Sequence, residues 1–510
     1  MMSASFEKVK PLSSLLTPEE KAEFQGYEFP FENLAFEGGG SKGMAYVGMI
    51  RVFEELDLMK NMKRFAGSSA GSAAATFLAI GMDSYEIQEL LDGDFTRNVY
   101  DGKWGLVGRM LGMVRKLGAH PGERLEKWFA DSVYKKTGDR NYTFRQLYQD
   151  RGVELCAVSV NLNLMDAVYF HVKTMPDMPI SLAGRASASI PGVLQPVKYH
   201  EDLYVDGGLL CNFPIHVYDG WFLSMDPTDS FFAQFGSLVG RCDEWDPSER
   251  FSTFNEKTVG VLLYSSAERD VMKQSLDHRV AVYGKEEIAF PDSKISRKNK
   301  KKKERHSQAT EGMHQAMDNF MKILKDSDTD QNGIISREEF RNALGKKNDN
   351  VTLSADDVKL LFECENDPDA IFDVVDKDNN GQIDYQEVVE QAAKRGINLL
   401  QTMNGYERCE IKGVTDLFAT MAETLLLNVK RITTRNTDYS RTIGINTKYL
   451  ESFDWNSERA DKNFLIQCGK RATLSFLREY IATKNPPRKS TPEEDASATE
   501  QTDLNIQIVI

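Results

Sequence analysis

The sequence has few of the features that cross-linked, secreted or membrane-spanning proteins need. Its 510 residues contain six cysteines, at positions 156, 211, 242, 364, 409 and 468, and no two of them form a C-x-x-C pair. In a chain of this length, scattered cysteines indicate reduced thiols rather than a disulfide framework. No run approaches the ~18 apolar residues of a membrane-spanning helix, and the N-terminus has no apolar core of signal-peptide type. We therefore expect a cytoplasmic protein whose membrane contacts are peripheral.

An excess of positive charge is also absent. Lysine and arginine number 63 against 77 aspartates and glutamates, so the formal net charge is -14. Electrostatics therefore gives no global reason to expect a nucleic-acid partner. What the chain does have is the composition of a globular protein, 41% hydrophobic and 27% charged, and enough length for more than one domain.

From residue 33 the chain has two repeats of one scheme, an apolar strand, a glycine-rich turn and a helix. NLAFEGGGSKGMAYVGMIRVFEEL, from residue 33, is the first, and MKRFAGSSAGSAAATFLAIGM, from residue 62, is the second. ELCAVSVNL and AVYFHV, further on, are typical of strands. Strands that alternate with helices predict an α/β fold with a largely parallel sheet.

Three serines lie among small residues in the second turn. GSSAG, residues 67–71, matches G-x-S-x-G with Ser69 at its centre. A nucleophile at a sharp strand-to-helix turn needs small neighbours, so that the backbone can bend and a substrate can approach. Ser68 and Ser72 lack glycines at both flanking positions, so Ser69 is the candidate nucleophile. The alternative is that the small residues only let a helix pack closely on the sheet.

The first turn, GGGSKG at residues 38–43, matches G-x-G-x-x-G, which is also the pattern of a dinucleotide-binding turn. That interpretation needs an acidic residue about 20 positions later at the end of a second strand, but Glu54 and Glu55 fall in a predicted helix. Backbone N–H groups at a helix N-terminus suit a developing oxyanion, and Lys42 adds positive charge nearby. The candidates for an oxyanion hole are therefore Gly38, Gly39, Gly40, Ser41, Lys42 and Gly43.

The general base is less clear from the sequence. The chain has seven histidines, and none lies in a tight glycine-flanked turn. LYVDGG, residues 203–208, instead ends an apolar strand with Asp206 and two glycines. A carboxylate can deprotonate a serine directly where a dry site raises its pKa. A plain Asp-Gly turn is the alternative for this segment, and His200 and His216 leave a catalytic triad open.

The motifs GGGSKG, GSSAG and DGG, in this order, resemble those of the patatin-like phospholipase family. RASASIPGVLQPV, residues 185–197, is similar to the family's segment before its acid, and stretches within residues 441–477 resemble its closing strand and helix. The resemblance covers roughly residues 31–290 and 410–480 and implies a three-layer α/β/α sandwich. It also implies a Ser69–Asp206 dyad without histidine, an oxyanion turn at Gly38 to Gly40, and hydrolysis of acyl esters of glycerolipids.

Two twelve-residue segments interrupt this pattern: DTDQNGIISREE at 328–339 and DKDNNGQIDYQE at 376–387. Each has side-chain oxygens at positions 1, 3 and 5, glycine at 6 and glutamate at 12, as a calcium-binding loop requires. The pair resembles an EF-hand module, and the isoleucines at position 8 are expected to join the loops through a short strand. The expected ligands of two Ca²⁺ ions are Asp328, Asp330, Asn332, Ile334 and Glu339 in the first loop and Asp376, Asp378, Asn380, Gln382 and Glu387 in the second, with Ile334 and Gln382 donating backbone carbonyls.

The expected organisation has five parts. Residues 1–30 form an N-terminal extension, 31–290 the first part of the hydrolase domain, 291–405 an all-α EF-hand insert with a basic linker, 406–485 the closing part, and 486–510 a disordered tail. Together they predict a calcium-binding lipid acyl hydrolase of phospholipase A or lipase type, acting at a membrane or lipid-droplet surface. We expect calcium to change lid position or membrane docking by ordering the insert. A calcium sensor or scaffold with an idle hydrolase domain is the alternative.

Overall fold

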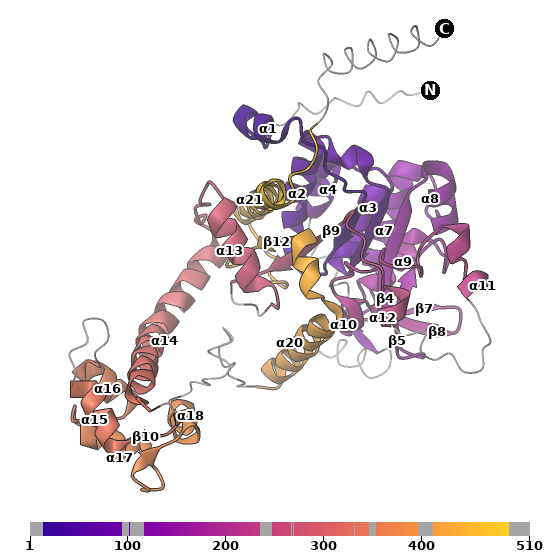
Figure 1. Ribbon diagram of the computed structural model, residues 1–510. Coiled ribbons are helices and arrows are strands. Elements are labelled where there is room, and N and C mark those ends of the chain that lie inside the picture. The colour runs from indigo at the N-terminus through magenta and orange to yellow at the C-terminus, as the bar shows by residue number, and fades with distance from the viewer. Residues whose placement is uncertain are drawn as a thin grey trace. The chain divides into compact units, whose positions relative to one another are not determined.

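The computed structural model describes residues 14–93, 101, 117–234, 247–266, 268, 270–330, 332–345, 353–395, 411 and 413–488 (Figure 1). The chain divides into two compact units, residues 1–296 together with 422–510, and residues 297–421. Most of the predicted disordered tail, residues 489–510, lies outside the described residues.

The first unit is built around a mixed sheet that has eight strands within the described residues. Five strands are parallel, in the order β12-β9-β1-β2-β4, and three antiparallel strands follow on the β4 side. The strands are β1 Asn33–Phe36, β2 Arg64–Ser68, β4 Glu154–Asn161, β5 Asp166–Phe170, β7 Val197–Tyr199, β8 Asp202–Asp206, β9 Thr258–Tyr264 and β12 Thr442–Asn446. The predicted α/β fold with a largely parallel sheet is confirmed. A separate short pair, β3 Gly118–His120 and β6 Gly192–Leu194, is parallel.

Helices cover this sheet on both faces. Because side chains alternate along a strand, Leu34 and Phe36 of β1 enter one hydrophobic core and Ala35 enters another. The first core holds side chains of α2, α3, α7, α9 and α21, and the opposite face is covered by residues 211–223 and α13. This is the three-layer arrangement that the family resemblance implied.

The helices around the sheet are consistent with the local signals of the sequence. The first helix, α1, begins after Thr17, whose side chain forms a capping box with Glu20. The helices of this unit are α1 Pro18–Phe24, α2 Met44–Glu55, α3 Ala70–Ala79, α4 Ser84–Asp92, α7 Glu123–Thr137, α8 Phe144–Arg151, α9 Ile180–Ser187, α10 Gly208–Cys211, α11 Phe231–Gln234, α12 Pro247–Arg250, α13 Lys273–Tyr283 and α21 Arg459–Lys484. A 3-10 turn, η1 Gly40–Gly43, joins β1 to α2.

The second unit is helical except for one short pair of strands. Its elements are α14 Lys294–Ser327, β10 Ile335–Ser336, α15 Arg337–Gly345, α16 Ala355–Leu361, α17 Pro368–Val375, β11 Gln382–Ile383 and α18 Tyr385–Lys394, while α20 Val414–Thr433 leads back toward the closing strand. Ile335 lies opposite Ile383 in the antiparallel β10–β11 pair, which confirms the predicted link between the loops. Phe320, Phe340 and Phe372 lie in the core of this unit.

The basic linker predicted from the lysine-rich residues 297–305 lies within α14, so its backbone is helical. Lysine has a good helix propensity, which makes this outcome physically ordinary. Within the described residues, no helix combines the length and the apolar character that crossing a membrane would take.

Candidate active site

Ser69 lies at the sharp turn between β2 and α3. Its backbone has φ 52° and ψ -123°, a conformation that residues with a side chain rarely adopt. The glycines two positions away on each side permit this turn. A Cβ on Gly67 would overlap the backbone of Gly71, and a Cβ on Gly71 would overlap the carbonyl of Phe36. Ser69 thus has the strained geometry of a nucleophile elbow.

Burial separates Ser69 from the two neighbouring serines. Ser68 and Ser72 are fully buried, and neither hydroxyl has a hydrogen-bond partner in the described structure. Ser69 is partly exposed, and its N–H donates a hydrogen bond to the Ser187 hydroxyl at 3.1 Å. Of the three serines, Ser69 is therefore the one that a substrate can reach.

Asp206 ends β8 and is only 5% exposed. Its Oδ1 accepts a hydrogen bond from the Gly208 N–H at 2.7 Å, whereas Oδ2 has no partner at normal hydrogen-bond distance in the described residues. Burial raises the pKa of Asp206 to about 6, against the lowering effect of the Gly208 N–H and the nearby Ser69 hydroxyl. The carboxylate is therefore a stronger base than an exposed aspartate, and Oδ2 is the oxygen left to accept a proton.

Strand pairing explains why these two residues meet. β2 pairs with β4 as far as Ser68, which lies opposite Val158. The next residue of β4, Ser159, pairs with β5 on one side and with Asp206 of β8 on the other. Asp206 therefore occupies the place that Ser69 would take if β2 continued. Because the chain turns away at Ser69, the hydroxyl and the carboxylate lie next to each other.

No histidine hydrogen-bonds either residue in the described part of the chain. His216 is buried 3.5 Å from the Tyr169 hydroxyl, and burial lowers its pKa to about 4. His200 is exposed on the turn before β8. The geometry therefore favours direct transfer of the serine proton to a carboxylate over a triad.

The glycine turn after β1 lies against Ser69 and Ala70, at the start of α3. A Cβ on Gly38 would come 3.0 Å from the Ser69 Cβ, and one on Gly43 would come 3.6 Å from the Ala70 Cβ. The Gly38 N–H donates to the Asn212 carbonyl at 3.0 Å, so it is not available to a substrate. The glycines at these positions bring the backbone of the turn close to Ser69 and Ala70.

Within the turn, some backbone N–H groups are engaged and others are available. The Ser41 N–H donates to the Ser452 carbonyl at 2.9 Å and the Lys42 N–H to the Gly39 carbonyl at 3.1 Å. The N–H groups of Gly39 and Gly40 donate to no acceptor outside the turn, as far as the structure is described. Of the six predicted positions, Gly39 and Gly40 therefore fit an oxyanion best.

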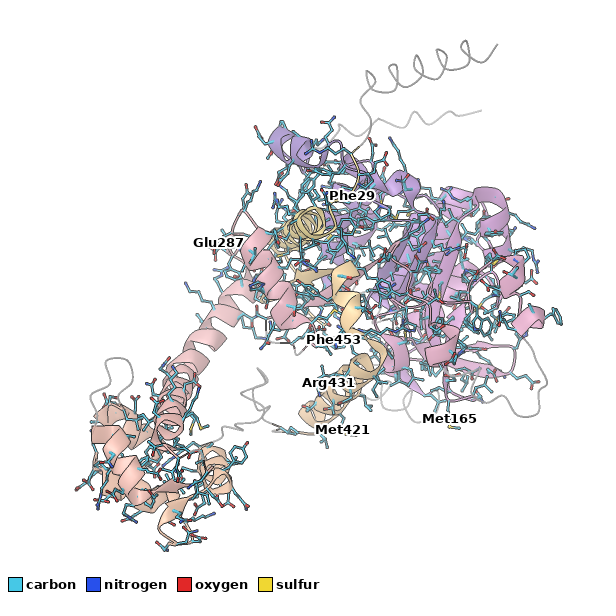
Figure 2. All side chains as sticks on the ribbon, in the orientation of Figure 1. Phe29, Met165, Glu287, Met421, Arg431 and Phe453 are labelled. Atoms are coloured by element: carbon cyan, nitrogen blue, oxygen red, sulfur yellow. The ribbon has the colours of Figure 1, made fainter. Side chains whose placement is uncertain are left out.

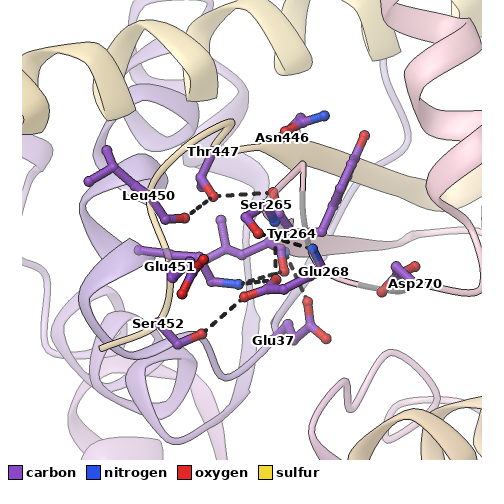
Figure 3. A network of polar contacts seen from close by, with 12 residues as sticks. Glu37, Tyr264, Ser265, Glu268, Asp270, Asn446, Thr447, Leu450, Glu451 and Ser452 are labelled. Carbon is purple, nitrogen blue, oxygen red and sulfur yellow. Dashed lines mark hydrogen bonds and ion pairs between the residues drawn. The ribbon is translucent and has the colours of Figure 1, made fainter. Parts of the chain in front are cut away.

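Lys42 does not offer a free positive charge to this site. Its side chain is 3% exposed, and Nζ donates to the Glu268 carboxylate at 2.6 Å and to the Leu263 carbonyl at 3.3 Å. The same carboxylate accepts the Ser452 hydroxyl at 3.5 Å (Figure 3). Lys42 thus ties the glycine turn to the loop that follows β9, and its charge is paired.

Sequence reasoning missed two further groups beside the turn. Glu37, directly before the glycines, accepts hydrogen bonds from the Leu263 N–H at 2.9 Å and the Asn212 amide at 3.2 Å. It also pairs with Lys430 at 2.7 Å, and Lys430 pairs with Asp270. The position of Asn212 shortly after the DGG motif was a usable signal. Lys430 had none, because 393 positions separate it from Glu37.

A pocket opens between the glycine turn and α3. Its lining includes Gly40 and, from three different helices, Ala70, Phe77, Leu91 and Trp128. Along α3, Phe77 lies about 10 Å beyond Ala70, given 1.5 Å of rise per residue. The rings of Phe77 and Trp128 meet edge to face with centroids 5.2 Å apart. The pocket thus extends from Ala70, the residue after Ser69, toward an aromatic pair.

The second predicted calcium loop gathers three carboxylates. Oxygens of Asp376, Asp378 and Glu387 lie within 4.8 Å of one another, and Asp376 is 2% exposed. Gly381, with φ 78°, turns the loop so that its N–H donates to Asp376 at 3.0 Å. A hard divalent cation needs such a group of oxygens, so this loop fits Ca²⁺.

The first loop has the same turn, with Gly333 also at φ 78°. Its Glu339 carboxylate accepts hydrogen bonds from the Ser336 N–H at 2.9 Å and the Thr329 hydroxyl at 3.0 Å, and bonds with Ser336 lower its pKa. The described residues of this loop do not bring three carboxylates as close together as the second loop does. Asp328 of the first loop is partly buried. The remaining predicted ligands not described above are exposed: Asp330, Asn332 and Ile334 in the first loop, and Asn380 and Gln382 in the second.

Comparison with protein families identifies both parts of the chain. Residues 34–219 match the patatin-like phospholipase family, and residues 321–344 and 369–390 match the EF hand. The chain therefore has a patatin-like phospholipase segment followed by two EF-hand segments, as the motifs indicated.

Several known proteins are similar to the first of these parts. The uncharacterized protein R571 of Acanthamoeba polyphaga mimivirus is 33% identical over 205 residues, which are 40% of this chain and 65% of that protein. The probable lipid hydrolase 463L of Invertebrate iridescent virus 6 is 28% identical over 37% of this chain and 63% of its own length. The chain thus spans just under two thirds of these relatives. Among solved structures, VipD from Legionella pneumophila has a TM-score of 0.39 at 13% identity, covering 89% of this chain and 68% of VipD.

Proposed function

We propose that this chain, in which a patatin-like phospholipase domain is joined to EF-hands, is a calcium-binding lipid acyl hydrolase of phospholipase A or lipase type. The observation that carries the proposal is that Asp206 and Gly38, the residue before Gly39 and Gly40, both lie beside Ser69. A strained and accessible hydroxyl, a buried carboxylate of raised pKa and two available N–H groups are the parts that acyl transfer needs.

In the proposed reaction, Ser69 Oγ attacks the carbonyl carbon of the lipid ester while Asp206 Oδ2 takes the hydroxyl proton. The carbonyl oxygen becomes an oxyanion that accepts hydrogen bonds from the Gly39 and Gly40 N–H groups. When the ester C–O bond breaks, the leaving alcohol takes the proton from Asp206. Ser69 is left as an acyl ester.

Water completes the cycle. Asp206, again ionised, accepts a proton from the water that attacks the acyl-enzyme, and the oxyanion forms once more at the glycine turn. Collapse of this second intermediate breaks the acyl–Oγ bond and returns the proton to Ser69. The fatty acid leaves, and both residues recover their starting states.

Exposed apolar side chains support a lipid substrate. Leu164 and Met165 follow β4 and are 66% and 84% exposed, and Phe453 follows β12 and is 63% exposed. Since the carboxyl ends of parallel strands share one edge, these groups lie at the edge where Ser69 follows β2. Figure 2 shows Met165 and Phe453 labelled on the side chains of this unit. Such groups suit contact with a membrane or lipid-droplet surface reached from the cytoplasm.

The test is fatty-acid release from mixed glycerolipid vesicles by the wild type, Ser69→Ala and Asp206→Asn. Release by the wild type, with each variant reduced by about 10³-fold or more, is the expected result, because removal of a nucleophile or its base removes the covalent route. A fluorophosphonate probe should label the wild type and leave Ser69→Ala unlabelled. Wild-type protein that neither releases fatty acid nor takes the label would refute the hydrolase and favour a calcium sensor.

A further inference from the structure

Glu37 is the residue directly before the glycine turn, and its carboxylate is held by hydrogen bonds. Its carboxylate is 3% exposed and is held by the Leu263 N–H and the Asn212 amide. Asn212 in turn holds Gly38 at both of its polar groups: its carbonyl accepts the Gly38 N–H at 3.0 Å, and its amide donates to the Gly38 carbonyl at 3.1 Å. The place of the turn relative to Ser69 therefore depends on where the Glu37 carboxylate is fixed.

The charge of Glu37 is unfavourable for the proposed chemistry. The transition state develops negative charge at Gly39 and Gly40, two and three positions after this carboxylate. In a buried site little water screens the repulsion between the two negative groups. Burial raises the pKa of Glu37, and the Lys430 ammonium, 2.7 Å from its Oε1, opposes that shift. A buried cation is thus what keeps this carboxylate compatible with an oxyanion nearby.

We propose that Lys430 is a positioning residue of the hydrolytic site, which fixes the glycine turn through Glu37 and offsets part of the negative charge of that carboxylate. Lys430 is 7% exposed, and its ammonium also pairs with Asp270, so it is held from two sides. The inference rests on the proposed function. It adds a component from outside the matched family segment, which ends at residue 219.

Lys430 lies in a helix that connects the EF-hands to the hydrolase part of the chain. It lies in the last turn of α20, the helix that follows the EF-hands in the sequence. The helix after the calcium-binding segment therefore supplies the cation that holds the oxyanion turn. An interaction needed only when the oxyanion forms affects kcat rather than KM, which separates it from a group that merely binds substrate.

The experiment measures kcat and KM for a soluble p-nitrophenyl ester, with active sites counted by fluorophosphonate labelling. Lys430→Met should lower kcat at least about tenfold with little change in KM, because a displaced turn misaligns its N–H donors. Lys430→Arg, which keeps the charge, should recover most of the loss. A merely structural role would lower the melting temperature and the number of active sites, but not kcat per active site.

A double-mutant cycle tests whether Lys430 acts through Glu37. In the Glu37→Gln background the carboxylate next to the glycine turn is gone and Lys430 pairs with Asp270 alone, so Lys430→Met should lower kcat clearly less than in the wild type. The double variant leaves one buried carboxylate, Asp270, without Lys430, whereas Lys430→Met leaves two, Asp270 and Glu37, so it is the variant to measure if Lys430→Met does not fold. Additive losses would overturn the proposal.

Arg279→Met is the matched control. Arg279 is also buried, at 1% exposed, and pairs with Glu479 at 2.5 Å, but it bonds the carbonyl of Thr442 at the start of β12, far from the carboxyl edge of the sheet. Arg279→Met should lower the melting temperature without changing kcat per active site. Equal kcat for Lys430→Met and the wild type would refute the positioning role alone, whereas absence of activity in the wild type would refute the proposed function with it.

Discussion

At the scale of single residues, the raised pKa of Asp206 makes a direct prediction about pH. Burial shifts this pKa to about 6, and no charged side chain contributes to the shift. The base works only when ionised, so kcat/KM should fall about tenfold for each pH unit below about 6 and level off above it. The measurement is kcat/KM for a soluble ester between pH 4.5 and about 8, with the folded state checked at each pH.

The raised pKa of Asp206 also predicts how the stability of the fold depends on pH, which serves as a control for the activity measurement. The folded state holds the Asp206 proton more tightly than the unfolded state. Above pH 6, where Asp206 is ionised in both states, the free energy of unfolding is therefore lower by on the order of 3 kcal/mol at most. Asp206→Asn should therefore raise the melting temperature at pH 8 and lose that gain at pH 4. An activity profile with its midpoint near 4 would mean that Asp206 is not the base or is not buried.

Local spacing was enough to predict some residues of the site and not others. Ser69 and Asp206 follow from short motifs, because the elbow and the Asp-Gly-Gly turn need small neighbours that are adjacent in sequence. Glu37 and Lys430 do not, because their pairing depends on how α20 packs against the loop after β1. The division of the turn into engaged and available N–H groups also depends on tertiary contacts, with Asn212 and Ser452 as the acceptors.

At the scale of elements, we predict that the pocket between α3, α4 and α7 limits the acyl-chain length of the ester substrate. Phe77 lies about 10 Å along α3 from Ala70, and Trp128 of α7 packs against its ring. Trp128→Ala should open this end, so that esters longer by two methylenes gain about 1.6 kcal/mol, roughly tenfold in relative kcat/KM. The measurement is the profile of kcat/KM against chain length for p-nitrophenyl esters.

Trp221→Ala is the matched control for this prediction. Trp221 lines a larger cavity, of about 610 Å³, together with Arg64 at the start of β2 and Lys257 before β9. That cavity therefore lies at the amino ends of the strands, at the opposite edge from Ser69. Trp221→Ala should therefore leave the profile of kcat/KM against chain length unchanged. An unchanged profile for Trp128→Ala would show that the acyl chain lies elsewhere.

The elements themselves show what the sequence could and could not predict. Apolar periodicity, glycine turns and the spacing of calcium ligands located the strands, helices and loops, since each of these signals is local. The antiparallel part of the sheet was not predictable in the same way. Asp206 reaches Ser69 because β8 takes over the edge of β4 where β2 ends, and nothing in either segment alone specifies that pairing.

At the scale of the whole molecule, the two units are linked through the chain on both sides of the EF-hands. α14 leads into the calcium-binding unit, and α20 leads back to the closing strand β12 and carries Lys430. Calcium can change hydrolysis only if it binds some states of the protein better than others. The course of the chain makes α20 the segment through which we expect such a preference to reach the active site.

The two proposed calcium sites should differ in affinity, and this difference tests the link. The second loop already gathers Asp376, Asp378 and Glu387, so less reorganisation is needed there than in the first loop. Glu387→Gln should remove the tighter of two binding events in calorimetry, and Glu339→Gln the weaker. Each change should weaken its own loop by at least about tenfold, because it removes a bidentate ligand and a negative charge.

Fatty-acid release then shows whether binding matters to catalysis. The wild-type rate should differ between calcium and chelator, and Glu387→Gln should give the chelator rate in both conditions at a calcium concentration that fills only the tighter site. Lys430→Met should also lose the difference, since the proposed connection to the glycine turn is broken, although its calcium binding by calorimetry should be unchanged. A calcium effect that persists in Lys430→Met would mean that calcium acts by another route, such as docking to the lipid surface.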